Sequence, residues 1–338
     1  MKNSRRNFIK QTAAASVTLP LLGFSNVKRQ TSNEQLIIKP LALKAGDTIG
    51  ITCPATAIWD MTSINKFLDK LKELGLKLKI GKTLTEKYGY FAGTDELRAK
   101  ELNDFFADKE VKGVFCAKGG YGCARILDML DYDMIAKNPK VIMGFSDITA
   151  LLLAINKKTG IITYHGPVGN SGWNDFSVGY VKSVLMNKEK TVFESKEKVT
   201  ITSGKAKGLL IGGNLSVLTS IIGSNYLPSF ENKILFLEDA EEEPYSMDRM
   251  LTQLKLCGIL KVLSGIVFGK CAKCVAEEPS QAFTYEEMIL QNIKPLNIPS
   301  YYNAAFGHTT DKFTLPIGIQ AEMDAEKGTV TLLEEAVM

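Results

Sequence analysis

Two segments far apart in the chain contain residue types that a hydrolase needs, Gly144-Phe145-Ser146-Asp147 and Phe306-Gly307-His308. The chain has only two histidines, His165 and His308. A serine hydroxyl is a poor nucleophile at neutral pH and needs an adjacent base, most often an imidazole that a third group orients. Any serine–histidine mechanism in this chain therefore has two candidate bases.

Ser146 lies between an expected strand and an expected helix. The apolar run Val141–Phe145 is typical of a buried parallel strand, and Asp147 opens a helical run that reaches Ile155. A serine on such a tight turn has the geometry of a nucleophile elbow, which exposes Oγ and aims the next backbone N–H at an oxyanion. The hydrolase pattern Gly-x-Ser-x-Gly is incomplete because Ile148 takes its last position, so a helix N-cap serine remains the alternative.

Candidate acids follow another expected strand. Glu238 and Asp239 come directly after the apolar run Lys233–Leu237, and open α/β sheets place their sites at the carboxyl ends of strands. Glu238 is favoured over the acidic stretch Glu241–Glu243, which is typical of a solvated loop. Asp239 is the nearest competitor, because neighbouring residues of a strand face opposite sides of the sheet.

A glycine-rich turn, Gly119-Gly120-Tyr121-Gly122, separates the expected strand Val111–Cys116 from an expected helix that runs from Cys123 to Leu130. Glycines let the backbone approach a ligand closely and offer a second N–H to an oxyanion. Taken alone, the turn would equally suit a phosphate. Arg125, beyond it, has the charge to bind a substrate carboxylate, although a helix-surface arginine is the more frequent case.

The two histidines differ in their surroundings. His308 lies in a turn-like segment, Gly307-His308-Thr309-Thr310, and is favoured as the base. The expected strand Ile161–Tyr164 delivers His165 to the same sheet edge as Ser146, which makes His165 the rival base. Its position before Gly166-Pro167 also suits a structural role, in which a ring nitrogen fixes the turn.

Taken together, these motifs resemble those of the LD-carboxypeptidases, serine peptidases that remove the terminal D-alanine from the murein tetrapeptide. That family also contains the microcin-immunity peptidases. The matching motifs, in family order, are Gly119-Gly120-Tyr121-Gly122 with Arg125 and Leu127, Gly144–Thr149, His165-Gly166-Pro167, Leu237-Glu238-Asp239 and Gly307-His308. The similarity extends from about Ile38 to about Leu333.

The resemblance implies roles for individual residues. Ser146 is the nucleophile, Glu238 the orienting acid and His308 the general base, and the amides of Asp147 and Gly120 form the oxyanion hole. It also implies a murein peptide as the substrate and allows a homodimer. The microcin-immunity alternative, which cleaves peptidyl or aminoacyl nucleotides, would use an aromatic ring to stack on a base, and Trp173 is available for that purpose.

No metal or other cofactor is expected. A serine mechanism needs no Lewis acid. Cys271-Ala272-Lys273-Cys274 has the spacing of half a zinc site, but no second pair matches it. The six cysteines lie mostly in apolar runs and are expected to be mostly buried thiols, with a disulfide after export left open.

The amino terminus predicts the location of the protein. Ser4-Arg5-Arg6-Asn7-Phe8-Ile9-Lys10 matches the twin-arginine export pattern, and the apolar stretch Thr12–Phe24 that follows is too short for a stable membrane anchor. We therefore expect residues 1–35 to be a cleaved leader that the twin-arginine export machinery recognises. The mature protein is then periplasmic.

Composition and periodicity indicate the fold. The net charge of +4 includes six basic residues of the leader, so the mature chain is near neutral. No basic patch interleaved with aromatic residues is present, which argues against nucleic-acid binding. Strands alternating with helices over residues 36–170 predict an α/β domain with a parallel sheet that carries the nucleophile.

The remainder is expected to form a second domain. Residues 171–205 are polar and lysine-rich and predict a linker with one helix. Residues 206–338 predict a more β-rich α/β domain that carries the acid and the base. The active site is then expected in the cleft between the two domains. A non-catalytic periplasmic binding protein, with two α/β domains around a cleft, is the alternative from another functional class.

Overall fold

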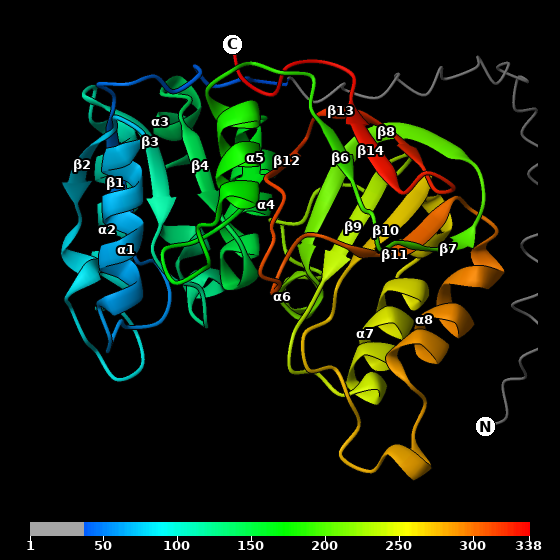
Figure 1. The fold of residues 1–338 in the computed structure, drawn as a ribbon. Helices are drawn as coiled ribbons and strands as arrows, with labels where there is room; N and C mark the ends of the chain where they lie inside the picture. The colour runs from blue at the N-terminus through cyan, green and yellow to red at the C-terminus, as the bar shows by residue number, and fades with distance from the viewer. Residues whose placement is uncertain (1–36) are drawn as a thin grey trace, which may run out of the picture. The chain divides into compact units, whose positions relative to one another are not determined.

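The computed structural model of the chain, drawn in Figure 1, describes residues 37–338. The predicted leader, residues 1–35, lies outside these residues, so export by the twin-arginine route stays a prediction. Within residues 37–338 no helix is both long and apolar enough to cross a membrane. The described strands form two sheets.

The first sheet has six strands in the order β12-β5-β4-β3-β1-β2, and all except β12 run parallel. The strands are β1 (Thr48–Thr52), β2 (Lys77–Ile80), β3 (Val111–Cys116), β4 (Val141–Gly144), β5 (Thr163–His165) and β12 (Leu315–Ile317). The associated helices are α1 (Thr62–Glu73), α2 (Asp95–Ala107), α3 (Tyr132–Lys137), α4 (Thr149–Thr159) and α5 (Asp175–Leu185). Three 3₁₀ helices accompany them, η1 (Lys82–Leu84), η2 (Cys123–Met129) and η3 (Ser146–Ile148).

The second sheet has eight strands in the order β6-β14-β13-β8-β9-β10-β11-β7 and is mixed, with β8 to β11 parallel. The strands are β6 (Val192–Glu194), β7 (Val199–Thr202), β8 (Lys205–Asn214), β9 (Ile234–Glu238), β10 (Gly265–Gly269), β11 (Ser300–Ala304), β13 (Gln320–Asp324) and β14 (Thr329–Leu332). The helices are α6 (Leu215–Ser220), α7 (Pro244–Leu256) and α8 (Tyr285–Ile293), with 3₁₀ helices η4 (Leu260–Val262), η5 (Pro279–Gln281) and η6 (Lys294–Leu296). Helices α7 and α8 pack against each other (Figure 1).

This architecture confirms the predicted fold class, a parallel-sheet α/β domain followed by a more β-rich one. Thr94 caps α2, its hydroxyl accepting the Leu97 N–H at 3.3 Å. The helix expected after the glycine-rich turn is instead the 3₁₀ helix η2. The helix expected from Asp147 begins with the 3₁₀ turn η3 before α4 continues it.

The stretch 171–205 differs from the predicted linker. It contains the expected helix, α5, but also β6 and β7, which form the two edges of the eight-stranded sheet. An edge strand has one side open to solvent, so it carries polar and charged residues and lacks the apolar run that marks a central strand. Six of the seven residues in β6 and β7 are partly or fully exposed, in a lysine-rich segment, which explains why the sequence did not reveal them.

The chain also crosses between the two sheets near its carboxyl end. Strand β12 pairs antiparallel with β5 of the first sheet, with Leu315 opposite His165. The last residue, Met338, donates its backbone N–H to Pro40 and accepts that of Ala42, each at 2.9 Å. The second half of the sequence therefore completes the first sheet, which differs from the predicted division at residues 170 and 206.

Two contacts hold the carboxyl end of β8 against the start of α4. The backbone N–H of Asn214 donates to Thr149 Oγ1 at 3.0 Å. Gly213 has a φ of +141°, and a Cβ on it would lie 2.5 Å from Thr149 Cγ2. Only glycine fits this close approach. This close approach joins α4, the helix that follows Ser146, to β8. Strand β8 in turn pairs with β9, with Asn214 opposite Glu238.

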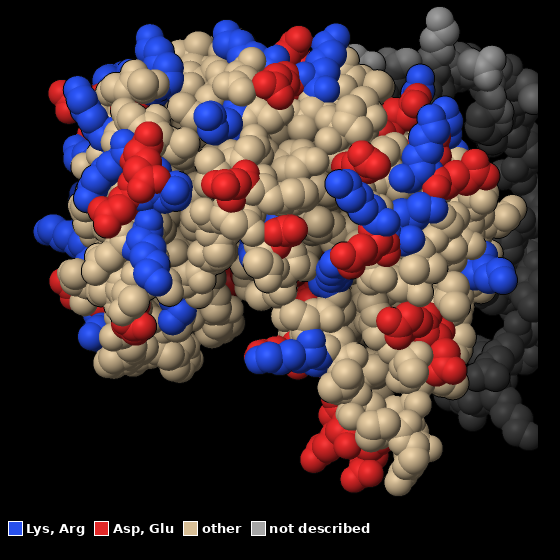
Figure 2. All heavy atoms as spheres, in the orientation of Figure 1, with Lys and Arg blue, Asp and Glu red and all other residues tan. Residues whose placement is uncertain are grey.

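The surface carries charges of both signs. Figure 2 shows acidic and basic side chains interspersed on the face that it draws. Cys271 and Cys274 form a disulfide, while Cys53, Cys116 and Cys123 are buried thiols. Among residues 37–338 no group of three or more His, Cys, Asp and Glu side chains is arranged to hold a metal ion.

Candidate active site

Ser146 occupies a strained turn between β4 and η3. Its φ is +61°, a left-handed conformation that few residues other than glycine adopt. Gly144 permits the turn, because a Cβ on it would lie 2.8 Å from Ile148 Cγ2. The strand-to-helix turn predicted from the sequence is therefore present, and no residue caps η3 with its side chain. Thus the geometry is that of an elbow and not that of an N-cap serine.

The two histidines meet at one carboxylate. Glu238 Oε2 accepts the ring Nδ1–H of His308 at 2.8 Å and its backbone N–H at 3.2 Å. Glu238 Oε1 lies 3.7 Å from His165 Nε2 and accepts the side-chain N–H of Asn214 at 3.3 Å. From the sequence, the two histidines were alternative candidates for the general base. The structure places both rings beside Glu238, and His308 is the one that is hydrogen-bonded to it.

Burial and charge set the ionisation of this group. Burial by itself would raise the pKa of Glu238, but the neighbouring His165 and His308 rings outweigh it and lower its pKa to about 2. Burial would lower the pKa of His308, and its hydrogen bond to Glu238 reverses the effect and raises that pKa above 6.5. An ionised carboxylate only accepts hydrogen bonds, so Nδ1 of His308 carries the proton and Nε2 is left as an acceptor.

Asp239, the competing acid, faces away from the histidines. Its carboxylate accepts the N–H of Ser216 at 2.9 Å, the side-chain N–H of Asn214 at 3.0 Å and the N–H of Ala240 at 3.0 Å. Burial and then the charge of Glu238 raise the pKa of Asp239 to about 6. The alternation expected for a strand end thus separates the two acids, and Asp239 fixes the first turn of α6.

Ser146 and His308 line one cavity of about 550 Å³. The two residues come from different sheets, since Ser146 follows β4 and His308 follows β11. The His308 ring packs edge-on against Phe145, with centroids 4.8 Å apart. Ser146 Oγ makes no hydrogen bond to any described residue. In unliganded enzymes the hydrogen bond between a nucleophile and its base is often long and tightens only when a substrate binds. The cavity therefore draws on both domains, as the sequence predicted.

The two candidate oxyanion amides are available for a ligand. Among residues 37–338, neither the Gly120 N–H nor the Asp147 N–H donates to a protein acceptor. Gly120 also lines the cavity, and its φ of +110° leaves a Cβ 2.1 Å from Thr56 Oγ1, so only glycine fits. The Asp147 carboxylate accepts the Cys123 N–H at 2.8 Å, which ties the elbow to η2. The sequence analysis did not predict this contact between the Asp147 side chain and Cys123.

Two residues suggested for substrate binding lie away from the cavity lining. Arg125 pairs with Asp95, Nη2 to Oδ2 at 2.6 Å, and stacks over the Phe91 ring. Trp173 donates its indole N–H to the Val168 carbonyl at 3.0 Å, and its ring packs against another aromatic ring, that of Phe67. Both side chains are occupied by these contacts, so the structure gives neither a place at the cavity.

Two lysines that the sequence analysis passed over do line the cavity, Lys118 and Lys312. Lys118 Nζ donates to the Ala57 carbonyl at 3.0 Å, and Lys312 Nζ donates to the Thr309 carbonyl. Neither ammonium has a carboxylate partner within residues 37–338. Burial lowers the pKa of Lys312, against the charge of Glu238. The sequence does hold a signal for both: Lys118 directly precedes the glycine-rich turn, and Lys312 is four residues after His308.

Comparison with known proteins identifies related chains. Models of the LD-carboxypeptidase N-terminal and C-terminal domains match residues 49–166 and 207–323. A probable murein peptide carboxypeptidase of Bacillus subtilis is 38% identical over 87% of this chain and 94% of its own. The microcin C7 self-immunity protein MccF of Escherichia coli is 30% identical over 89% of this chain and 96% of its own.

Solved structures agree with the sequence matches. The unliganded structure of MccF superimposes with a TM-score of 0.83 and 26% identity, covering 89% of this chain and 100% of that one. The muramoyltetrapeptide carboxypeptidase of Oxalobacter formigenes superimposes with a TM-score of 0.75 and 28% identity, covering 84% and 97%.

The pairing of Glu238 with His308 predicts the titration of the imidazole. Because the chain has two histidines, NMR of histidine-labelled protein follows each ring separately. We expect the pKa of His308 to lie above 6.5 and to fall in Glu238→Gln, since that change removes the negative charge.

Glu277→Gln is the matched control, because Glu277 is an exposed acid on the loop between β10 and α8. It should leave the titration unchanged. A His308 pKa that is the same in the wild type and in Glu238→Gln would contradict the arrangement.

Proposed function

Because this chain belongs to the LD-carboxypeptidase family, we propose that it removes the terminal D-alanine from murein tetrapeptides by a serine mechanism. The observation that carries the proposal is the hydrogen bond between the buried Glu238 and His308 at the cavity that Ser146 lines. The name of the Bacillus subtilis relative, a probable murein peptide carboxypeptidase, supports this choice of substrate.

The proposed reaction starts at the free nitrogen of His308. Nε2 removes the proton from Ser146 Oγ as the oxygen attacks the carbonyl carbon before D-alanine. The amides of Gly120 and Asp147 receive the oxyanion of the tetrahedral intermediate. His308 then gives its proton to the leaving amine, D-alanine departs, and the shortened peptide remains as an ester of Ser146. Water, deprotonated by His308, hydrolyses that ester. Glu238 stabilises the imidazolium at each transfer.

A carboxypeptidase must also recognise the free carboxylate of the residue that it removes. Lys118 and Lys312 line the cavity, and neither ammonium is neutralised by a carboxylate of the described chain. Lys312 is only 6% exposed, and a buried ammonium is most stable when an anion pairs with it. We assign the terminal carboxylate of the substrate to these two lysines.

The microcin-immunity activity is the second candidate, supported by the similarity to MccF. In the sequence analysis Trp173 was the aromatic ring that would stack on a nucleotide base. That ring packs against Phe67, its N–H is bonded to the Val168 carbonyl, and it does not line the cavity. The absence of Trp173 from the cavity lining makes the murein peptide the better-supported substrate.

We predict that the purified protein releases D-alanine from a tetrapeptide that ends in a diamino acid–D-alanine bond. The same peptide with an amide in place of the terminal carboxylate should react much more slowly, because the two lysines lose their anion. Lys312→Met should raise the KM for the free acid more than it lowers kcat, and it should have little effect on the amide. Chromatography of released D-alanine measures both rates.

Two outcomes would redirect the assignment. Turnover of an aminoacyl-nucleotide conjugate with no turnover of tetrapeptides would favour the microcin-immunity activity. Equal rates on the acid and the amide would remove the role of the lysines while leaving the serine mechanism intact.

Substitutions in the triad should have related effects. Ser146→Ala and His308→Ala are each expected to lower kcat by a factor on the order of 10⁴ or more, and the double variant by little more, because the two residues act as a unit. Glu238→Ala should lower it less, since the acid orients and stabilises the base. Steady-state kinetics on the tetrapeptide provide the comparison.

His165→Ala is the informative companion, since its ring lies near Glu238 without a hydrogen bond. It should lower activity without abolishing it. A folded His308→Ala that stays active while His165→Ala is inactive would reverse the assignment of the base.

A further inference from the structure

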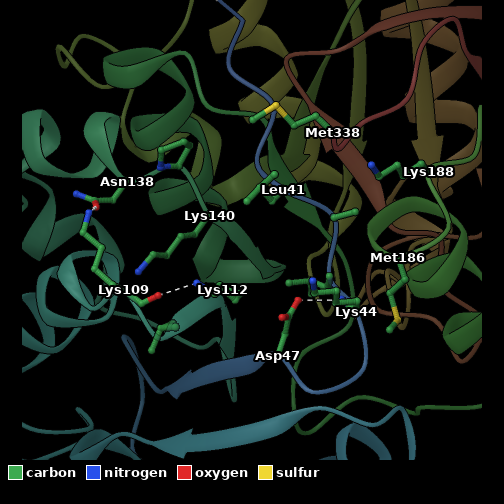
Figure 3. A pocket seen from close by; sticks show the side chains of 14 residues that line it. Leu41, Lys44, Asp47, Lys109, Lys112, Asn138, Lys140, Met186, Lys188 and Met338 are labelled. Atoms are coloured by element: carbon green, nitrogen blue, oxygen red, sulfur yellow. Dashed lines mark hydrogen bonds between the residues drawn. The ribbon is translucent and has the colours of Figure 1, made fainter.

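A second cavity, of about 620 Å³, lies at the opposite edge of the first sheet (Figure 3). Val111, the first residue of β3, lines it, as do Asp47, directly before β1, and Lys140, directly before β4. Ser146 and Gly119 follow the other ends of β4 and β3. The cavity is therefore separate from the candidate active site, at the amino ends of the strands.

Its lining is strongly basic. Among residues 37–338, five lysines contribute to it and Asp47 is the only acidic side chain; the lysines are Lys44, Lys109, Lys112, Lys140 and Lys188. Within residues 37–338 none of these five ammonium groups forms an ion pair, whereas Lys39, Lys70, Lys79 and several other lysines do. No carboxylate of the described protein is therefore ion-paired with these five ammonium groups.

Lys140 shows how the charges are held. It is 7% exposed, and its ammonium donates to the carbonyls of Phe105, at 2.8 Å, and Asp108. These carbonyls are neutral acceptors. Burial lowers the pKa of Lys140 to about 8; the charge of Asp108 opposes this, and those of the neighbouring lysines, including Lys112 and Lys109, add to it. The ammonium groups of Lys109 and Lys112 are therefore close enough to that of Lys140 to repel it, which an anion between them would relieve.

Hydrogen bonds fix other parts of the lining. Lys112 Nζ donates to the Lys109 carbonyl at 2.7 Å, and Lys109 Nζ donates to Asn138 Oδ1. In Figure 3 these three residues lie on the same side of the view as Lys140, and Lys44 and Lys188 lie on the other. Charge is thus presented to the cavity from more than one side.

The remaining wall is apolar and partly open to solvent. Leu41 is 61% exposed and Met338 is 54% exposed, although both are large hydrophobic residues. Met186 and Leu43 extend this wall. An inorganic ion would not use such a surface, so the lining suits a ligand with an anionic group and a carbon-containing body. The volume is within the range of small-molecule sites.

We propose that this cavity binds a phosphate-bearing organic ligand, with the lysines holding the phosphate and the apolar wall covering its body. A phosphate with more than one negative charge contacts several ammonium groups at once, whereas a single carboxylate neutralises only one. Lysine binds phosphate as a point charge from several directions, and no arginine of the described part of the chain, with its fixed fork geometry, lines this cavity. The phosphate belongs either to a soluble metabolite or to a phospholipid headgroup.

The test compares two triple variants of the full chain. Lys44→Gln/Lys112→Gln/Lys188→Gln removes three exposed charges of the cavity, and Lys66→Gln/Lys82→Gln/Lys294→Gln removes three exposed charges elsewhere, so that the net charge is the same. Isothermal titration calorimetry at low ionic strength measures binding of glycerol 3-phosphate and of pyrophosphate, with acetate as the single-carboxylate comparison.

We expect the wild type and the control variant to bind both phosphates more tightly than acetate. The cavity variant should bind them about tenfold more weakly. A single Lys112→Gln variant, expected to lose part of the affinity, serves if the triple variant does not fold. An absence of phosphate binding by the wild type, or an equal loss in both triple variants, would overturn the proposal.

Sedimentation with vesicles separates the two sources of phosphate. Binding to phosphatidylglycerol vesicles, but not to phosphatidylcholine vesicles, that requires the three cavity lysines would assign the site to a headgroup. Binding of glycerol 3-phosphate without vesicle binding would assign it to a soluble ligand. Because the cavity lies at the other edge of the sheet, neither result depends on the proposed peptidase activity.

Discussion

The buried carboxylate of Glu238 is the constraint to which the rest of the site is fitted. An ionised group that is 2% exposed is unstable unless partners replace the water it has lost. Here the partners are the ring and backbone N–H groups of His308, the side chain of Asn214 and the nearby ring of His165. They keep the acid charged, and the charged acid in turn fixes the proton of His308 on Nδ1, as a serine mechanism requires.

Close backbone approaches hold these groups in place. Gly307 has a φ of +84°, and a Cβ on it would lie 2.2 Å from Glu238 Oε2, so the residue before the base must be glycine. Gly213 allows β8 to meet α4, the helix that begins after the Ser146 turn. Strand β12 then returns from the second half of the chain and pairs beside His165. The two sheets are therefore joined where the candidate nucleophile, base and acid converge.

Much of this arrangement was predictable, because its signals are local. The sequence alone shows the apolar runs of β3, β4 and β9 and the polar residues that follow them. These are enough to place Ser146 and Glu238 at the carboxyl ends of strands. The edge strands β6 and β7 were missed because exposed lysine-rich segments lack that signal. The shared carboxylate was also missed, since only the fold brings His165, on β5, next to Glu238, on β9. Lys312 was passed over because its burial, which makes it informative, is a tertiary property.

The central claim is that Ser146 is a nucleophile activated by His308. Reaction with a serine-directed fluorophosphonate, followed by mass spectrometry of the intact protein and its peptides, tests it most directly. The account predicts a single adduct on the peptide that contains Ser146, formed rapidly at neutral pH and much more slowly in His308→Ala and Glu238→Ala. Labelling at another serine, or a wild-type protein that is not labelled at all, would contradict it.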